Sequence, residues 1–258
     1  MLLKVKSALI WTGIALLTIF WLPFVALFWL FERTKAKYWT GFLFRKLGHA
    51  YTFVNPAWKI SIERDVKGIN PRRPFIVVCN HQSHADVPLI SRLPWDMKWV
   101  AKSDIFKVPF VGWMMRMAQD IPVYRKSKNK KAMTIQNAQE AISGRSSVMF
   151  FPEGTRSKDG RVLRFTDGAF IVAIKNQLPI LPLVIDGSSN CLPKNDWVFK
   201  KISHVRLKVL QPIETTGMTM DDLAEIRDRV RRIIIHQLAE WRNVDPSEVD
   251  TLTGNTLA

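Results

Sequence analysis

The chain has few of the residues and motifs that identify several common protein classes. Only two of its 258 residues are cysteines, Cys79 and Cys191, so we expect no disulfide framework. Free thiols are typical of a reducing compartment. No glycine-rich loop carries the lysine of a nucleotide-binding motif, which argues against nucleotide hydrolysis. The serine hydrolase pattern Gly-x-Ser-x-Gly is also missing.

Metal-ligand spacing is missing as well. His49, His204 and His236 stand alone, so we expect neither a metal nor a bound cofactor. Acidic residues are scarce: the chain has 38 Lys and Arg but only 22 Asp and Glu, which gives a net charge of +16. Such an excess implies an anionic partner. Because no RNA-binding aromatic signature or long basic tail accompanies it, we expect anionic membrane lipid and not nucleic acid.

A long uncharged run is present near the N-terminus. Residues 8–31 contain no charged side chain, and as a helix they would rise about 36 Å, more than a hydrocarbon core of about 30 Å. A cleaved signal peptide is the alternative, because Lys4 and Lys6 precede the run. However, the run is too long for such a peptide, and no small-x-small site closes it. We predict a membrane anchor, which Pro23 could turn into a hairpin that dips into the bilayer without crossing it.

The segment after the anchor mixes aromatic and cationic residues. Residues 37–49 therefore predict a second, amphipathic helix that lies along the headgroups. More cations follow the anchor than precede it, which places the rest of the chain on the cytoplasmic side. We expect three parts: residues 1–56 as anchor and interfacial helix, residues 57–244 as the body, and residues 245–258 as a flexible tail.

The body alternates strand and helix patterns, which predicts an α/β fold with a mixed sheet flanked by helices. Strands are expected at residues 58–64, 75–79, 97–101, 120–124, 147–151, 180–185 and 204–210. Helices are expected at residues 87–92, 110–118, 130–143, 168–176 and 220–241, the last one amphipathic, with Thr219 as its candidate cap.

His81 and Asp86 follow the strand expected at residues 75–79. On a regular helix, five residues would turn them about 140° apart, so they meet only if His81 lies on the strand-end loop and Asp86 begins the next helix. The carboxylate would then orient the imidazole as a general base. The alternative is that Asp86 only caps the helix and His81 is a loop residue.

A second polar segment, Glu153-Gly-Thr-Arg156, follows the strand expected at residues 147–151. Gly154 permits close backbone approach, Thr155 adds a hydroxyl, and Arg156 can hold a phosphate with two hydrogen bonds. Glu153 could accept a hydrogen bond from a substrate hydroxyl or pair with Arg156. An ordinary surface turn with an exposed ion pair is the alternative.

Two more cations, Lys102 and Arg125, each follow an expected strand and are candidates for the same cleft. For either residue alone, a solvated surface position is the simpler interpretation.

The order of these segments resembles the glycerolipid acyltransferase family. Its Asn-His-x-Ser-x-x-Asp block is similar to Asn80–Asp86, and its Phe-Pro-Glu-Gly-Thr-Arg block is similar to Phe151–Arg156. The resemblance covers roughly residues 57–215. In its size and its N-terminal anchor, the chain is most similar to the bacterial 1-acyl-sn-glycerol-3-phosphate acyltransferases. It implies that His81 is the base and Asp86 orients it. It also implies that Glu153–Arg156 contact the acceptor phosphate and that Lys102 lies near the reacting centre.

The resemblance implies transfer of a fatty acyl group from acyl-CoA or acyl-carrier protein to a lysophospholipid, most simply 1-acyl-sn-glycerol 3-phosphate, giving phosphatidic acid in phospholipid biosynthesis. It also implies a bacterial inner membrane. Transfer to another lysophospholipid, a membrane-bound thioester or phospholipid hydrolase, and a non-catalytic lipid-binding anchor are the alternatives. The paired His81 and Asp86 argue against the last.

Overall fold

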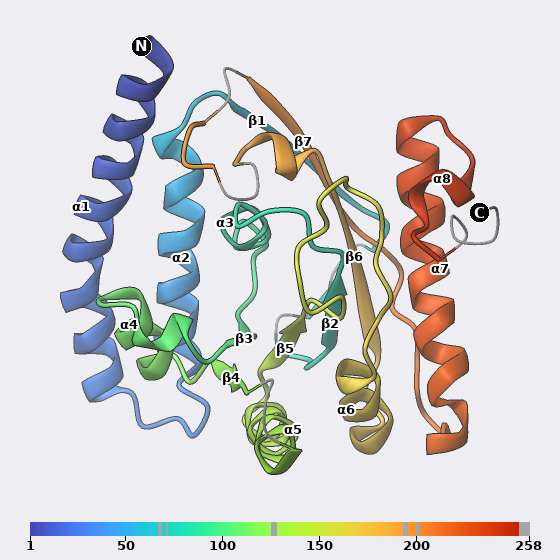
Figure 1. Cartoon of the computed structure of the whole chain (residues 1–258). Helices are drawn as coiled ribbons and strands as arrows, with labels where there is room; N and C mark the ends of the chain where they lie inside the picture. The colour runs from blue at the N-terminus through green and yellow to red at the C-terminus, as the bar shows by residue number, and fades with distance from the viewer. Residues whose placement is uncertain (67–68, 71, 125–127, 193–195, 200–201, 253–258) are drawn as a thin grey trace. The chain divides into compact units, whose positions relative to one another are not determined.

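The computed structural model describes residues 1–66, 69–70, 72–124, 128–192, 196–199 and 202–252 (Figure 1). These residues form two compact units, each made of several stretches of chain. The first unit contains residues 1–56, 69–75 and 87–149, and the second contains residues 57–68, 76–86 and 150–258. The chain therefore passes between the units several times, which differs from the consecutive parts expected from the sequence.

The first unit begins with two long helices, α1 (Leu2–Phe31) and α2 (Tyr38–Val54), which lie side by side (Figure 1). They run antiparallel, because Thr18 Oγ1 lies 2.5 Å from Tyr51 Oη while Trp21 Nε1 donates to Leu43 O at 3.0 Å. Pro23 lies inside α1. Both predicted N-terminal helices are confirmed, and each is longer than the sequence pattern indicated.

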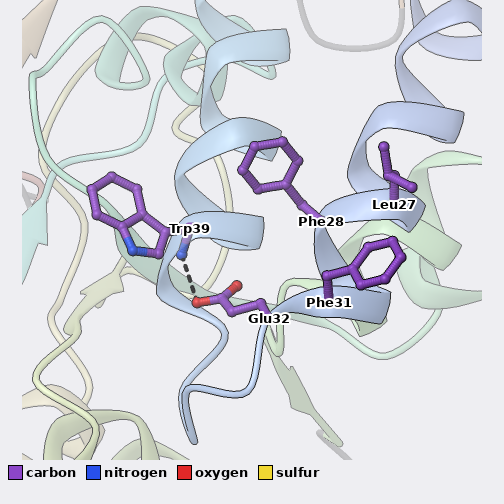
Figure 2. Close-up of a pocket in the computed structure, with 5 residues that line it drawn as sticks. All are labelled: Leu27, Phe28, Phe31, Glu32 and Trp39. Carbon is purple, nitrogen blue, oxygen red and sulfur yellow. Dashed lines mark hydrogen bonds between the residues drawn. The ribbon is translucent and has the colours of Figure 1, made fainter.

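The turn between α1 and α2 is closed by a carboxylate. Glu32 accepts hydrogen bonds from the Trp39 amide at 2.9 Å and the Thr40 amide at 2.8 Å, which satisfies the first turn of α2. Glu32 and the apolar side chains of Leu27, Phe28, Phe31 and Trp39 line a hollow at this end of the helix pair (Figure 2).

The rest of the first unit holds three parallel strands and their helices. β3 (Met97–Lys102) pairs with β5 (Ser147–Phe150) on one side and with β4 (Ile121–Val123) on the other. The helices are α3 (Asp86–Ile90), which starts at the boundary between the units, α4 (Val111–Met117) and α5 (Lys128–Ser143). Met114 of α4 is fully buried against α1 and α2. The membrane-type helices are thus part of a packed body.

The second unit holds four strands in the order β1, β7, β6, β2, with bounds Trp58–Arg64, Ser203–Val209, Ile180–Asp186 and Ile76–Cys79. β1 and β7 are parallel, β7 and β6 antiparallel, and β6 and β2 parallel, so the sheet is mixed as predicted. Helices α6 (Gly168–Asn176) and α7 (Leu223–Arg242) pack with these strands. β2 and β6 are almost wholly buried, so their ends are firmly placed.

The expected flexible tail differs from the structure over its first part. Asp245 accepts from the Ser247 amide at 2.8 Å and begins the short helix α8 (Pro246–Val249), with proline in its first turn. Val249 is buried, and Asp250 pairs with Arg231 of α7. The sequence pattern missed this helix because it has only four residues. Residues 253–258 lie outside the described residues.

Candidate active site

The His81 loop leaves the buried end of β2 in a fixed direction. The side chain of Asn80 donates from Nδ2 to the Ile185 carbonyl at 2.8 Å and accepts from the Ile185 amide at 2.9 Å. Asn80 therefore extends the contact between β2 and β6 by one residue. Its hydrogen bonds to β6 are made by its side chain and not by its backbone. Ser83, in the same loop, donates from Oγ to the Leu192 carbonyl at 2.8 Å. The loop is held on both sides of His81.

His81 and Asp86 meet as the sequence spacing required. Asp86 is the first residue of α3, and its Oδ2 lies 2.7 Å from His81 Nδ1. The same oxygen accepts from the amides of Gln82 at 2.8 Å and Ser83 at 3.0 Å. These amides precede α3, so the carboxylate closes the histidine loop and does not cap the following turn. The alternative in which Asp86 is only a helix cap is therefore not what these contacts show.

The geometry leaves one ring nitrogen of His81 available. A carboxylate only accepts hydrogen bonds, so Nδ1 carries the proton and Nε2 keeps its lone pair. The Asp86 side chain is fully buried, while the His81 side chain is 16% exposed. The ring of His81 stacks on Phe151, with centroids 3.9 Å apart and planes inclined by 18°. A partly exposed base with a buried orienting acid is suited to take a proton from a substrate.

The second motif holds the backbone of His81 directly. Glu153, 72 residues later in the chain, accepts from the His81 amide at 2.8 Å through Oε1. The Ser157 amide donates to the His81 carbonyl at 2.8 Å. Both backbone polar groups of the histidine are therefore bonded to residues of the segment from 151 to 157. The two sequence motifs form one unit in space.

Glu153 is held from a second side as well. Its Oε2 accepts from the Leu163 amide at 3.1 Å, and the residue is buried. Burial raises the pKa of Glu153 to about 8, although the two amide hydrogen bonds oppose this rise. The sequence suggested a substrate hydroxyl or Arg156 as its partner. The structure adds a different role, in which both carboxylate oxygens hold backbone amides of the site.

The residues expected to hold a phosphate form an accessible turn. Gly154 has φ of 66°, a conformation that favours glycine, and it is exposed together with Thr155. Arg156 is half-buried. The next residue, Ser157, is buried because it bonds to the histidine loop. The turn therefore presents its tip to solvent while its far end is fixed beside His81.

The remaining predicted cations are less informative. Lys102 is the last residue of β3, is exposed and belongs to the first unit. Arg125 lies outside the described residues. Among the described residues, no three His, Cys, Asp or Glu side chains are grouped as a metal site. The sequence analysis missed Asp186 and Arg242, which lie beyond the polar motifs and carry no local signal of their own.

Comparison with known proteins gives consistent matches. Residues 62–186 match the family model described as Acyltransferase. The chain is 32% identical over 191 residues to 1-acyl-sn-glycerol-3-phosphate acyltransferase LPAT1, chloroplastic, of Arabidopsis thaliana, a match that covers 74% of this chain and 52% of that protein. It is 32% identical over 180 residues to 1-acyl-sn-glycerol-3-phosphate acyltransferase alpha of Homo sapiens, covering 67% and 63%. The chain thus spans less than two thirds of these relatives.

A solved structure resembles nearly the whole chain. It is the 1-acyl-sn-glycerophosphate (LPA) acyltransferase, PlsC, from Thermotoga maritima, with a TM-score of 0.77 and 26% sequence identity. The superposition covers 93% of this chain and 95% of the other. The mixed α/β fold and the N-terminal helices are therefore shared with that structure.

Proposed function

We propose, from the match of residues 62–186 to the acyltransferase family model, that the chain moves a fatty acyl group from a thioester to the free hydroxyl of 1-acyl-sn-glycerol 3-phosphate. The observation that carries the proposal is the His81–Asp86 pair, whose Nδ1–Oδ2 distance is 2.7 Å. The names of the similar proteins support the same acceptor. The product is phosphatidic acid.

The reaction needs one base and no cofactor. His81 Nε2 takes the proton of the acceptor hydroxyl as its oxygen attacks the thioester carbonyl. The new C–O bond forms and the C–S bond breaks, so the acyl group leaves its sulfur. The proton held on His81 then passes to the departing thiolate. Asp86 keeps the ring in one tautomer and stabilises its protonated form between these steps.

The acceptor phosphate is proposed to lie on the turn at residues 154–156. Arg156 can bind two phosphate oxygens at once, and Gly154 and Thr155 leave the turn open to solvent. Holding the phosphate fixes the hydroxyl beside the base, and such positioning lowers the entropic part of the barrier. Lys102 and Arg125 are further proposed contacts of the substrate.

The N-terminal helices are proposed to bind a membrane. Helix α1 is long and apolar enough to cross a bilayer. However, α2 packs against α1, where Thr18 and Trp21 of α1 bond to residues of α2. Helix α4 packs on the same helix pair. A complete crossing by α1 would carry these partners into the hydrocarbon, including the buried Arg45–Asp120 pair. This packing supports shallow insertion from the cytoplasmic face, with the +16 charge attracting anionic lipid.

The test is an assay of purified protein against a panel of lysophospholipids, each with acyl-CoA and with acyl-carrier protein as donor. We expect 1-acyl-sn-glycerol 3-phosphate to react fastest, and His81→Ala to lose about 10²- to 10⁴-fold in rate. Arg156→Lys should raise KM for the phosphorylated acceptor and leave KM for the donor nearly unchanged, because an ammonium cannot make the bidentate contact. Release of free fatty acid without ester formation would favour a hydrolase instead.

A further inference from the structure

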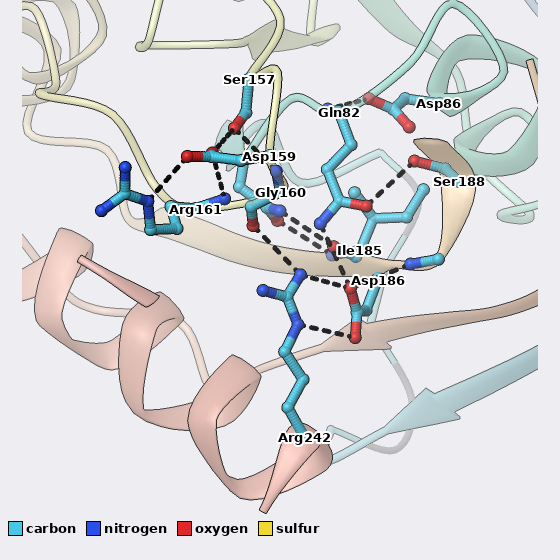
Figure 3. A network of polar contacts seen from close by, with 12 residues as sticks. Gln82, Asp86, Ser157, Asp159, Gly160, Arg161, Ile185, Asp186, Ser188 and Arg242 are labelled. Atoms are coloured by element: carbon cyan, nitrogen blue, oxygen red, sulfur yellow. Dashed lines mark hydrogen bonds and ion pairs between the residues drawn. The ribbon is translucent and has the colours of Figure 1, made fainter. Parts of the chain in front are cut away.

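Arg242, the last residue of α7, lies far along the chain from both motifs, yet its two partners, Asp186 and Gly160, each bond to a residue in or next to a motif. Its guanidinium makes two hydrogen bonds to Asp186, from Nη2 to Oδ1 at 2.6 Å and from Nε to Oδ2 at 3.1 Å. Nη2 also donates to the Gly160 carbonyl at 3.0 Å (Figure 3). The two side chains are only 25% and 21% exposed, so the pair is partly shielded from water.

Asp186 connects this guanidinium to the residue after the catalytic histidine. Its Oδ1 accepts from Gln82 Nε2 at 3.3 Å and from the Gly187 amide at 2.9 Å. Gln82 Oε1 in turn accepts from Ser188 Oγ at 3.4 Å. The neighbouring residue of β6, Ile185, holds Asn80. The end of β6 therefore contacts the side chains on both sides of His81, and Figure 3 shows Gln82 between Asp186 and Ser188.

Gly160 connects the same guanidinium to the end of the second motif. The Gly160 amide donates to Ser157 Oγ at 3.0 Å, and the Ser157 amide donates to the His81 carbonyl. Gly160 has φ of 80°, and a Cβ there would lie 3.2 Å from Arg242 Nη2. The turn thus fits closely against the arginine, and Figure 3 shows the guanidinium between the turn and Asp186.

We propose that Arg242 is a positioning residue that braces the histidine loop and the Glu153–Ser157 turn against each other. The inference rests on the proposed acyl transfer and adds to it a group that touches neither substrate. A planar guanidinium suits this place because it donates to a carboxylate and a carbonyl in fixed directions, which a lysine ammonium cannot reproduce. An exposed ion pair would only add a little stability, whereas this one joins both halves of the site.

The test compares Arg242→Met, Arg242→Lys and Asp186→Asn with the unchanged full chain. Arg242→Met removes all three hydrogen bonds of the guanidinium. Arg242→Lys keeps the positive charge but loses the two-pronged guanidinium geometry. Asp186→Asn keeps a hydrogen-bond acceptor but loses the negative charge. The matched control is Arg227→Met on the same helix, because Arg227 pairs with Asp167 and Asp228 and neither belongs to the site. Steady-state kinetics on both substrates, melting curves and amide hydrogen exchange are measured for each protein.

We expect Arg242→Met to lower kcat by about 10- to 100-fold, since a displaced base loses its alignment, while both KM values change little. Arg242→Lys and Asp186→Asn should give smaller losses of the same kind. Exchange should accelerate in peptides covering residues 80–86 and 156–162 and stay unchanged in β1 and β7. Arg227→Met should keep the unchanged chain's kcat and its exchange at the site.

Unchanged kcat in all three variants, or a loss of kcat in Arg227→Met as large as in Arg242→Met, would overturn the proposal. If Arg242→Met does not fold, the two milder variants decide the matter. The exchange measurement needs no substrate, so it tests the brace even if the unchanged chain transfers no acyl group. That last outcome would count against the proposed function alone.

Discussion

Replacing Glu153 with glutamine separates a positioning role from substrate binding at the same residue. The two carboxylate oxygens accept from the His81 amide at 2.8 Å and the Leu163 amide at 3.1 Å. Glutamine offers one oxygen and one NH2 group, so one buried amide must face a donor. An unsatisfied buried donor costs about 1–3 kcal/mol. We therefore expect Glu153→Gln to lose stability of that order and to lower kcat, because the side chain holds the His81 amide directly and is itself fixed by the Leu163 amide.

The assay pairs melting curves with kinetics on both substrates. If Glu153 positions His81, kcat falls while KM for the acceptor stays close to that of the unchanged chain. If Glu153 binds a substrate hydroxyl instead, KM for the acceptor rises and the melting temperature hardly moves. Glu225→Gln, at an exposed position of α7, is the matched control for a Glu-to-Gln exchange outside the site. A variant with normal melting and normal kcat would refute the positioning role.

The same variant tests the ionisation of Glu153. Its folded pKa is raised from 4.5 to about 8 by burial. Between these values the unfolded chain releases a proton that the folded chain keeps, so the stabilising contribution is complete below about pH 4.5 and is lost by about pH 8. Glutamine cannot titrate. We therefore expect the stability of the unchanged chain relative to the variant to fall as pH rises through this range, and a constant difference would contradict the raised pKa.

Three further outcomes are expected. Asp86→Asn should reduce kcat by about 10²- to 10⁴-fold in initial-rate assays, because the amide no longer selects the tautomer with its proton on Nδ1, and normal turnover would contradict this. Gly41→Ala should cost about 1–3 kcal/mol in thermal unfolding, since its Cβ would lie 2.7 Å from Asp96 Oδ2, whereas Gly168→Ala, with nothing within 4 Å, is the control. Arg45→Met should cost about 3–5 kcal/mol by leaving Asp120 buried without its cation, and an unchanged melting temperature would show that the pair is dispensable.

The sequence predicted most helices and strands because their patterns are strong. β2, β5 and β6 are buried on both faces and appear as continuous apolar runs. Thr219 forms a capping box with Asp222, but the turn that it caps is a short 3-10 helix at Met220–Asp222, and α7 itself begins only at Leu223. The helix α8 was missed because four residues give no periodicity. Its stability comes from Val249 and Asp250, which depend on partners distant in sequence.

In the candidate site, the contact between His81 and Asp86 was predicted from the sequence, whereas the contacts of Glu153 were not. The five-residue spacing of His81 and Asp86 limited them to a strand-end loop and a helix start, and the two side chains do meet there. The contacts of Glu153 with backbone amides could not be predicted, because nearly every residue has a backbone amide and the sequence does not show which one lies near Glu153. Arg242 was missed because its partners are brought to it only by the packing of α7 on β6.

The hold of Glu153 on the His81 amide also sets an order of events during synthesis. The apolar helix α1 leaves the ribosome before His81 does, so the membrane binding proposed for it can begin while the rest of the chain is still being made. His81 follows, but Glu153 comes 72 residues later, which at about 5–20 residues per second is a delay of about 4–14 s. Through that interval the nascent chain lacks the carboxylate that holds the His81 amide. The membrane binding proposed for α1 can thus begin before the proposed active site is complete.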